Sequence, residues 1–258
     1  MQNLFVMIYM IIDTHCHIYY SEMENAEEII IEAAKRDIHV ILNGTDSISN
    51  KEILELSEKY ENVYASLGYF YTLADEITDE DISLLDKQLK NDNVIAVGEI
   101  GLDYYHTKDN RDNQIELFEK MLDLAEKHDL PVIVHSRKAI QDTFDLLKRH
   151  DVRGSLHSYN GSAEMAQEFI KLGFYIGIGG PVTHNNNKKI RKMLKSIDIN
   201  HMLLETDSPY LAPEEKRGEK NTPLNIKYII RKIAEEMGMD EDEVIEITTE
   251  NAQKLFKI

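Results

Sequence analysis

Short apolar, β-branched runs recur along the chain, and longer segments with helical spacing separate them. Apolar residues in these longer segments, such as AEEIIIEAAKR and NQIELFEKMLDLAEKH, recur every three or four positions, which is typical of amphipathic helices. The runs number eight, at residues 10–14, 39–43, 63–67, 94–98, 132–135, 154–157, 175–178 and 202–205. Eight alternations of strand and helix predict an α/β fold, a parallel (β/α)8 TIM-type barrel, with an open doubly wound sheet as the alternative.

Two further helices are predicted after the eighth run. The segment PLNIKYIIRKIAEEMGMDEDEVIEITTENAQKLF keeps helical spacing, with Gly238 ending one helix and Asp240 beginning the next. No linker, low-complexity tract or repeat divides the chain, and 42% hydrophobic residues suffice for a large core. The sequence therefore predicts a single domain over residues 1–258, with extra C-terminal helices.

The first residues, MQNLFVMIYMII, are apolar but match no targeting segment. They lack a basic stretch, a small-residue cleavage site and the ~20 apolar residues of a membrane span, so we expect neither export nor membrane insertion. Because Met7 and Met10 directly precede the first strand, we expect residues 1–9 to be an N-terminal extension and the natural start to lie at one of these methionines.

Composition excludes some classes of protein. With 29 basic and 47 acidic residues the net charge is −18, which argues against a non-specific nucleic-acid-binding module. A nuclease is still compatible with this charge, because bound divalent cations invert the potential locally. The single cysteine, Cys16, excludes an internal disulfide framework and favours a cytoplasmic protein.

Metal-ligand residue types follow five of the eight strands. His15 and His17 are two positions apart, so their side chains share one face of the first strand. In a (β/α)8 barrel the C-terminal ends of all strands meet at one rim, where the chemistry lies. The residues at these ends are His15 and His17 on the first strand, Glu99 and Asp103 on the fourth, His135 on the fifth, His157 on the sixth and Asp207 on the eighth.

Each of these residues alone has an ordinary structural explanation. Glu99 could pair with an arginine, His135 and His157 could be satisfied core histidines, and Asp207 could cap a helix. Four histidines and the two carboxylates Glu99 and Asp207 at one rim are costly to bury unless a cation pairs with them.

A tetrahedral site uses four ligands, so six ligands predict two divalent metal ions. The predicted ligands are His15, His17, Glu99 and Asp207 for one ion, and Glu99, His135 and His157 for the other, with Glu99 as the bridge. The ligand types do not determine whether the metal is Zn, Mg, Mn, Co or Ni.

Such a centre activates water for hydrolysis. We expect Asp207 and Glu99 to be the catalytic residues, with Asp207 accepting the proton of the water. Glu205 is expected to orient His15 or His17 through the second ring nitrogen, or else to form an interior salt bridge.

These residues stand in motifs that resemble the TatD-type metal-dependent deoxyribonucleases of the amidohydrolase superfamily. The motifs run in fixed order over nearly the whole chain: IDTHCH, VGEIGLDYY, LPVIVHSR, LHSYNG, LLETDSPYL, RGEKNTP and NAQKLF. The resemblance implies a divalent-metal hydrolase that cleaves phosphodiester bonds in DNA, and it supports all six ligands. We expect exonuclease action on single-stranded or nicked DNA, with endonuclease action at damaged sites as the alternative. No obligate protein partner is expected.

Contacts with the substrate are predicted at three further residues. Arg137 and Arg217 could neutralise phosphate oxygens, and His184 could add a donor beyond the seventh strand. Arg137 could instead brace its loop, and Asp103 could be either a partner of a metal ligand or a loop anchor.

The loop after the third strand departs from the family pattern. The family usually carries a histidine–proline pair there, whereas this chain has Tyr69, Phe70 and Tyr71. These aromatic side chains could stack nucleobases, at about 1–3 kcal/mol per base, or could simply pack.

Two other functions fit the same residues. A two-metal barrel also suits ester, amide or aminoacyl-tRNA hydrolysis, because activation of water does not depend on the electrophile. Related amidohydrolases carry a carbamylated lysine on strand four, and Glu99 in its place favours the nuclease. A non-catalytic metal-binding or scaffold protein is the third possibility, which open coordination positions argue against.

Overall fold

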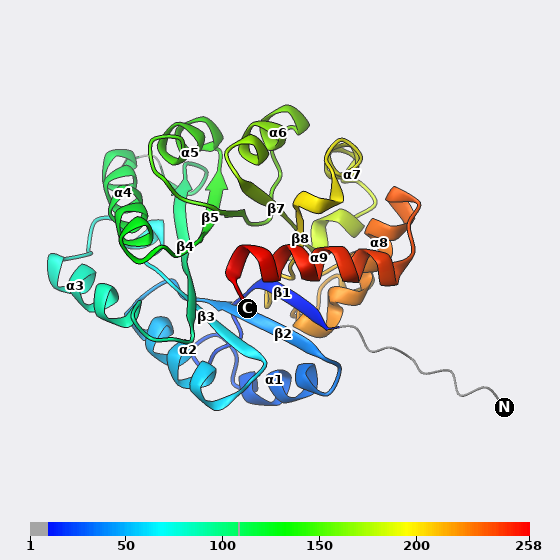
Figure 1. The fold of residues 1–258 in the computed structure, drawn as a ribbon, viewed down its shortest axis with the longest axis horizontal. Helices are drawn as coiled ribbons and strands as arrows, with labels where there is room; N and C mark the ends of the chain where they lie inside the picture. The colour runs from blue at the N-terminus through cyan, green and yellow to red at the C-terminus, as the bar shows by residue number, and fades with distance from the viewer. Residues whose placement is uncertain (1–9, 108) are drawn as a thin grey trace.

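The strands of the computed structural model, which describes residues 10–107 and 109–258, form a nearly closed parallel barrel surrounded by helices (Figure 1). The strands are hydrogen-bonded in sequence order: β1 (Ile11–Cys16), β2 (Ile38–Asn43), β3 (Val63–Leu67), β4 (Val94–Asp103), β5 (Val132–Arg137), β6 (Gly154–Leu156), β7 (Phe174–Ile178) and β8 (Met202–Leu204). The predicted (β/α)8 barrel is confirmed, and the open doubly wound sheet is wrong. The expected extension at residues 1–9 lies outside the described residues.

The first strand and the end of the last one close the barrel. The backbone N–H of Asp207 donates to the carbonyl of His15 at 2.8 Å, and the N–H of His17 donates to the carbonyl of Ser208 at 2.6 Å. Thr14 adds a side-chain hydrogen bond to the carbonyl of Leu204 at 3.0 Å. These bonds bring residues from the two ends of the barrel sequence to one point on the rim.

Helices cover the outside of the barrel. They are α1 (Ala26–Ala34), α2 (Ser47–Lys59), α3 (Asp79–Gln88), α4 (Arg111–His128), α5 (Ile140–Leu147), α6 (Ala163–Lys171), α7 (Lys188–Leu194), α8 (Ile226–Met237) and α9 (Glu241–Phe256). Short 3-10 helices are η1 (Tyr71–Leu73), η2 (Gly180–Thr183), η3 (Ile199–His201), η4 (Glu214–Lys216) and η5 (Pro223–Asn225). None of the helices in the described part of the chain has the length and apolar character that crossing a membrane requires.

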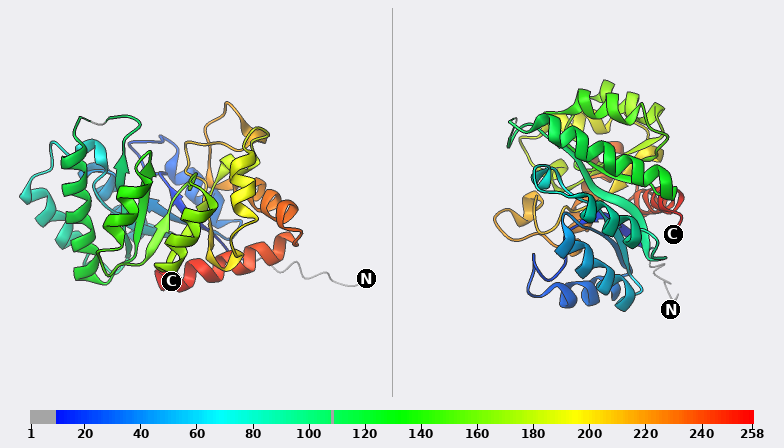
Figure 2. Two further views of the ribbon diagram at one scale, coloured as in Figure 1. Left: turned by 90° about the horizontal axis from the view of Figure 1, so that it is seen from above. Right: turned by 90° about the vertical axis from the view of Figure 1, so that its left-hand side faces the viewer.

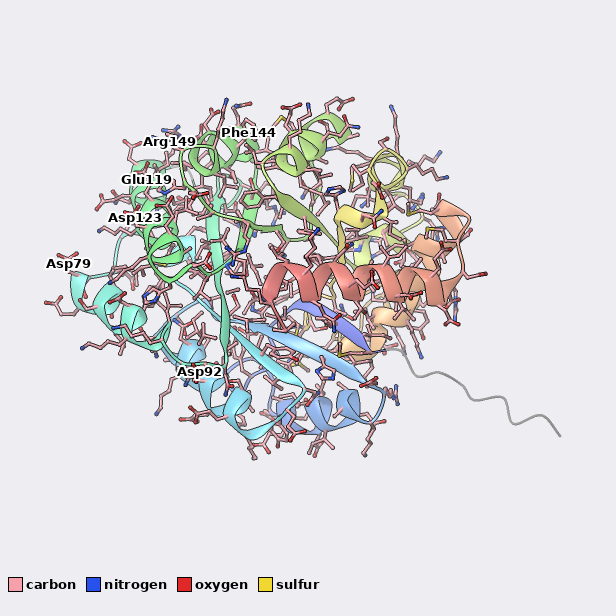
Figure 3. The ribbon with its side chains drawn as sticks, in the orientation of Figure 1. Asp79, Asp92, Glu119, Asp123, Phe144 and Arg149 are labelled. Carbon is pink, nitrogen blue, oxygen red and sulfur yellow. The ribbon has the colours of Figure 1, made fainter. Side chains whose placement is uncertain are left out.

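The connecting helices follow the predicted apolar spacing. In α4 the residues Leu117, Phe118, Met121, Leu122 and Ala125 are buried, so one stripe of the helix packs on the barrel. The opposite side of the outer helices is polar: Asp79 at the start of α3 and Asp123 on α4 are exposed and lie toward the edge of the molecule in Figure 3. These carboxylates are therefore solvated and take no part in the packing of the helices on the barrel.

The C-terminal helices close the bottom of the barrel. Gly238 ends α8 with a φ of 68°, and α9 begins after Asp240, as predicted. Leu255 and Phe256 of α9 pack with the apolar interior residues of the strands, including Ile12. Figure 2 shows α9 lying across the end of the barrel opposite the long loops that follow the strands.

Several strand boundaries differ from the predicted ones, and those at the ends of β4 and β8 affect the rim. β4 continues to Asp103, and Gly101 permits this because a Cβ at that position would lie 2.0 Å from the carbonyl oxygen of His135. β8 ends at Leu204, so Glu205 and Asp207 lie in the loop that follows it rather than in the strand.

Candidate metal centre

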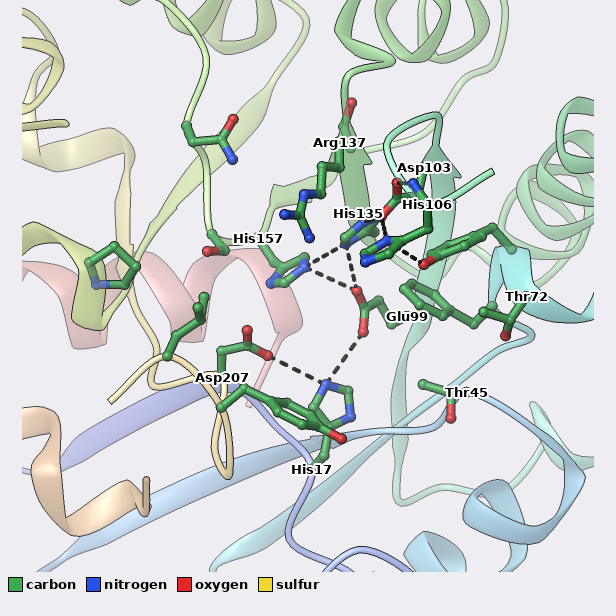
Figure 4. A pocket seen from close by; sticks show the side chains of 18 of the residues that line it. His17, Thr45, Thr72, Glu99, Asp103, His106, His135, Arg137, His157 and Asp207 are labelled. Carbon is green, nitrogen blue, oxygen red and sulfur yellow. Dashed lines mark hydrogen bonds and ion pairs between the residues drawn. The ribbon is translucent and has the colours of Figure 1, made fainter. Parts of the chain in front are cut away.

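The C-terminal ends of the strands open into a cavity of about 740 Å³ (Figure 4). His15 lies beneath the cavity lining and is fully buried. The other predicted rim residues line the cavity: His17, Glu99, Asp103, His135, Arg137, His157 and Asp207. The structure thus brings together residues from five strand ends, as the sequence predicts.

Four side-chain atoms form a first group: His15 Nε2, His17 Nε2, Glu99 Oε2 and Asp207 Oδ1. The two imidazole nitrogens are 3.1 Å apart, and each lies 3.4–3.6 Å from the two carboxylate oxygens. Ligands about 2.1 Å from a tetrahedral ion lie roughly 3.4 Å from one another. These five separations are thus close to those between the ligands of a tetrahedral cation, and His15, His17 and Asp207 by themselves form a group that could hold a metal ion.

Three atoms form a second group beside the first: Glu99 Oε1, His135 Nδ1 and His157 Nε2. The three separations are 3.0–3.1 Å, close to those expected for three corners of a similar site. The rings of His15 and His157 stack with centroids 3.9 Å apart, which places the two groups side by side. Glu99 belongs to both groups, with one oxygen in each.

Neighbouring acceptors fix the orientation of two imidazoles. His17 donates from Nδ1 to the carbonyl of Asn43 at 2.9 Å, and His135 contacts Asp103 Oδ2 through Nε2 at 3.1 Å. Since a carbonyl or a carboxylate accepts, the opposite nitrogen of each ring can present a lone pair to its group. This is the arrangement that a metal ligand requires.

The carboxylates and imidazoles of the two groups shift one another's pKa values. Burial by itself raises the pKa of Glu99, but the rings of His157 and His15 hold that pKa well below its ordinary value. Burial lowers the pKa of His17, yet its bonds to Asp207 and Glu99 raise it to about 9. A divalent cation could take the place of the imidazole protons, because metal binding and proton release are linked.

The loop that carries Asp207 is anchored by a buried pair. Thr206 donates to Asp13 from its backbone at 2.9 Å and from its hydroxyl at 2.6 Å. Asp207 itself has a φ of 56°, the left-handed conformation that aspartate tolerates better than most residues. Sequence reasoning missed Asp13 and Thr206, although an acid inside an apolar strand and a threonine between two acids are visible in the sequence.

Glu205 does not contact the histidines that the sequence suggested. Its Oε1 lies 3.9 Å from His157 Nδ1, and it accepts a hydrogen bond from the backbone of Ser158. The side chain turns this way because Gly177 leaves room for it: a Cβ there would lie 2.1 Å from Glu205 Oε2. Burial raises the pKa of Glu205 to about 8.

Of the predicted phosphate contacts, only Arg137 lines the cavity. Its guanidinium lies 4.0 Å from the ring centre of Tyr105, and it forms no ion pair within the part of the chain that the structure describes. Arg217 pairs instead with Glu214 at 3.1 Å, and His184 donates from Nε2 to the carbonyl of Ala212 at 2.9 Å. Neither Arg217 nor His184 lines the cavity.

The aromatic loop after β3 divides into two parts. Tyr69 is buried, and its hydroxyl bonds to Ser47 and to the carbonyl of Asp81, so it packs within the protein. Phe70 and Tyr71 line the cavity, with ring centres 5.0 and 5.7 Å from that of His135.

Sequence reasoning also missed His106 and Tyr210 in the cavity wall. Each follows a predicted residue by three positions, His106 after Asp103 and Tyr210 after Asp207, and that proximity is the signal that could have found them.

A (β/α)8 barrel with imidazoles and carboxylates gathered at the C-terminal rim is characteristic of the metal-dependent hydrolases. The model of one family in this class, described as TatD related DNase, matches residues 12–257, and the chain belongs to that family. The predicted resemblance is confirmed.

Curated relatives and a solved structure agree with this assignment. The chain is 37% identical to YabD of Bacillus subtilis, an uncharacterized metal-dependent hydrolase, with 96% of this chain and 100% of the relative aligned. It is 35% identical to an uncharacterized metal-dependent hydrolase of Methanocaldococcus jannaschii, over 95% of this chain and 96% of the relative. The crystal structure of YjjV, a TatD homologue from Escherichia coli, superposes with a TM-score of 0.90 at 31% identity, covering 98% of this chain and 100% of that one. The protein is therefore a metal-dependent hydrolase of the TatD family.

Proposed function

We propose that this protein hydrolyses phosphodiester bonds in DNA, using two divalent cations held at the barrel rim. The observation that carries the proposal is the position of Glu99, which offers Oε2 to one group of ligand atoms and Oε1 to another. The family's description as TatD related DNases supports DNA as the substrate.

Six side chains would hold the cations: His15, His17, Glu99 and Asp207 around one, and Glu99, His135 and His157 around the other. Four imidazoles suit Zn, Mn, Co or Ni, and the carboxylates also admit Mg. When bound, divalent cations supply Lewis-acid activation of water and neutralise charge on the phosphate.

Asp207 is the residue that would accept the proton of the attacking water. Burial raises its pKa, but hydrogen bonds from His15 and His17 hold that pKa far below its ordinary value, so the carboxylate is ionised at neutral pH. It lines the cavity, where water and substrate have access. Glu99 keeps the two groups of ligand atoms in a fixed relation to each other.

Arg137 would bind the non-bridging oxygens of the phosphate. Its guanidinium is held against Tyr105 and faces the cavity without a carboxylate partner among the described residues. A planar fork of N–H donors fits two phosphate oxygens at once. Among the described residues that line the cavity, Arg137 is the one lysine or arginine, and bound divalent cations would add further positive charge beside the lining carboxylates.

The cavity suits a strand end or a flexible single strand. A cavity of about 740 Å³ is too small to enclose a DNA duplex. The packed barrel interior closes the cavity from below. We therefore propose exonuclease action on single-stranded or nicked DNA.

A substrate panel tests the proposal. Protein loaded with Mn²⁺ is incubated with single-stranded DNA, nicked DNA, a carboxylic ester and aminoacyl-tRNA. We expect nucleotide release from DNA, and no comparable turnover of the other two substrates. Hydrolysis of the ester or of aminoacyl-tRNA without DNA cleavage would assign the same centre to another reaction of this superfamily, and no turnover of any substrate would indicate a metal-binding protein without catalysis.

A further inference from the structure

One imidazole in the cavity belongs to neither group of ligand atoms. His106 follows β4 and lies on the cavity wall beside Asp103 and His135 (Figure 4). Its side chain is 53% exposed, whereas the side chains of His15, His17 and His157 are all buried.

A buried carboxylate fixes the orientation of the His106 ring. Nδ1 of His106 lies 2.8 Å from Asp103 Oδ2, and the other oxygen of Asp103 accepts the backbone N–H groups of Tyr105 and His106 at 2.8 and 3.0 Å. The Tyr71 hydroxyl lies 3.0 Å from the same Nδ1. Since the ionised carboxylate of Asp103 can only accept, Nδ1 carries a proton that it donates to Asp103.

In this orientation Nε2 of His106 is available to solvent or substrate in the cavity. Within the described residues, no side chain or carbonyl bonds to that nitrogen, so it can exchange a proton with solvent or substrate. The same Asp103 Oδ2 also contacts His135 Nε2 at 3.1 Å, which places His106 next to the second group of ligand atoms. A similar pair, His128 Nε2 with Asp86 at 2.8 Å, lies outside the cavity on the outer helices.

We infer that His106 is the general acid that protonates the leaving oxygen of the phosphodiester, an inference that rests on the proposed function. Water adds its hydroxyl to phosphorus and gives its proton to the carboxylate of Asp207. The bond between phosphorus and the leaving nucleoside oxygen breaks, and that oxygen takes the proton from His106 Nε2. His106 is left neutral and is reprotonated by solvent.

A comparison of leaving groups tests this role. An oligodeoxynucleotide releases an alkoxide that needs a proton, whereas thymidine 5′-(p-nitrophenyl phosphate) releases a nitrophenolate that does not. In His106→Gln loaded with Mn²⁺, we expect kcat on the oligodeoxynucleotide to fall about 100-fold and kcat on the aryl ester to fall less than about 3-fold, because general acids contribute roughly 10²–10⁴-fold.

His128→Gln is the matched control, because it removes a carboxylate-paired histidine outside the cavity, and we expect it to change neither rate. Equal losses on both substrates in His106→Gln would show a structural role and overturn the inference, as would an unchanged rate on the oligodeoxynucleotide. Wild-type protein that releases no nucleotide from DNA would instead contradict the proposed function itself.

Ring tautomers provide a second readout that needs no turnover. In metal-free protein at pH 9, nitrogen-15 NMR of the histidine rings should show His106 protonated at Nδ1, and Asp103→Asn should abolish that preference. A neutral His106 ring protonated at Nε2 would overturn the inference, because Asp103 would then not hold the ring.

Discussion

Glu99 Oε1 lies 3.0 Å from His157 Nε2, while the second oxygen of the same carboxylate faces the imidazoles of His15 and His17. The side chain therefore joins residues from distant parts of the sequence into one polar cluster in the cavity wall. Removing it would leave two groups of ligand atoms without a common member.

Asp207→Ala should abolish hydrolysis while the barrel stays folded. The variant loses the proposed acceptor of the water proton and one ligand of the first group, and we expect kcat on single-stranded DNA to fall at least about 10³-fold. Nucleotide release and circular dichroism measure the two effects. Asp123→Ala, on the outer surface of α4, is the control; turnover in Asp207→Ala equal to that of the wild type would dismiss the role.

Chelation should remove activity reversibly. EDTA is expected to stop DNA hydrolysis, and Mn²⁺, Mg²⁺, Co²⁺ or Zn²⁺ to restore it, because the two groups of ligand atoms match cation sites in size. Metal analysis should find two ions per wild-type chain and one in a double variant, His135→Ala with His157→Ala, that lacks the second group. Full activity in EDTA contradicts the metal mechanism.

Arg137→Ala should weaken substrate binding. Loss of the guanidinium at the cavity wall is expected to raise KM for an oligodeoxynucleotide about 10-fold, since hydrogen bonds to charged groups contribute roughly 1.5–3 kcal/mol. Steady-state kinetics at constant salt measure KM and kcat. The control is Arg217→Ala, which changes an arginine paired with Glu214 outside the cavity lining and should leave KM unaltered. An equal KM in Arg137→Ala and Arg217→Ala would contradict phosphate binding by Arg137.

Tyr69→Ala should mainly lower stability, whereas Phe70→Ala should mainly affect DNA binding. Tyr69 is buried, so its truncation is expected to lower the free energy of unfolding by about 3–5 kcal/mol. Phe70 is partly exposed in the cavity, so its truncation should cost less stability and should raise KM for DNA if the ring stacks on a base. Urea denaturation measures the loss of stability, and steady-state kinetics measure the change in KM. An equally stable Tyr69→Ala protein would refute the packing role.

Glu236 should make stability depend on pH in the acid range. Its carboxylate pairs with Lys195 and Lys232 at 2.8 Å, and these bonds lower its pKa from 4.5 to about 2. A pKa lowered by folding stabilises the protein above pH 4.5, and this contribution disappears as the pH falls toward 2.

Glu236→Gln should therefore lower the free energy of unfolding by about 1 kcal/mol at pH 7, and the difference should shrink below pH 4.5. Thermal denaturation as a function of pH measures it. Glu235→Gln changes a more exposed neighbour and should have a smaller effect at every pH. A difference that stays constant from pH 7 to pH 3 would contradict the assignment.

The periodicity of the sequence predicted the barrel and the residues at its rim because strand direction and topology alone determine where strand ends meet. His135 lies within β5, so strand direction alone was enough to place it there. The direction of loop side chains depends on tertiary contacts that spacing does not encode. Glu214 draws Arg217 away from the cavity, the carbonyl of Ala212 holds His184, and the space above Gly177 turns Glu205 toward His157.

The hydrogen bond from Asp207 to His15 has a consequence for how the molecule folds. It joins the first strand to the segment after the last one, so it forms only after the long intervening chain has been ordered, and loop-closure entropy makes such late contacts slow. Partly folded species that lack either terminal strand cannot assemble His15, His17 and Asp207 around one ion. Tight binding of a cation by His15, His17 and Asp207 would therefore be a sign that the barrel has folded completely.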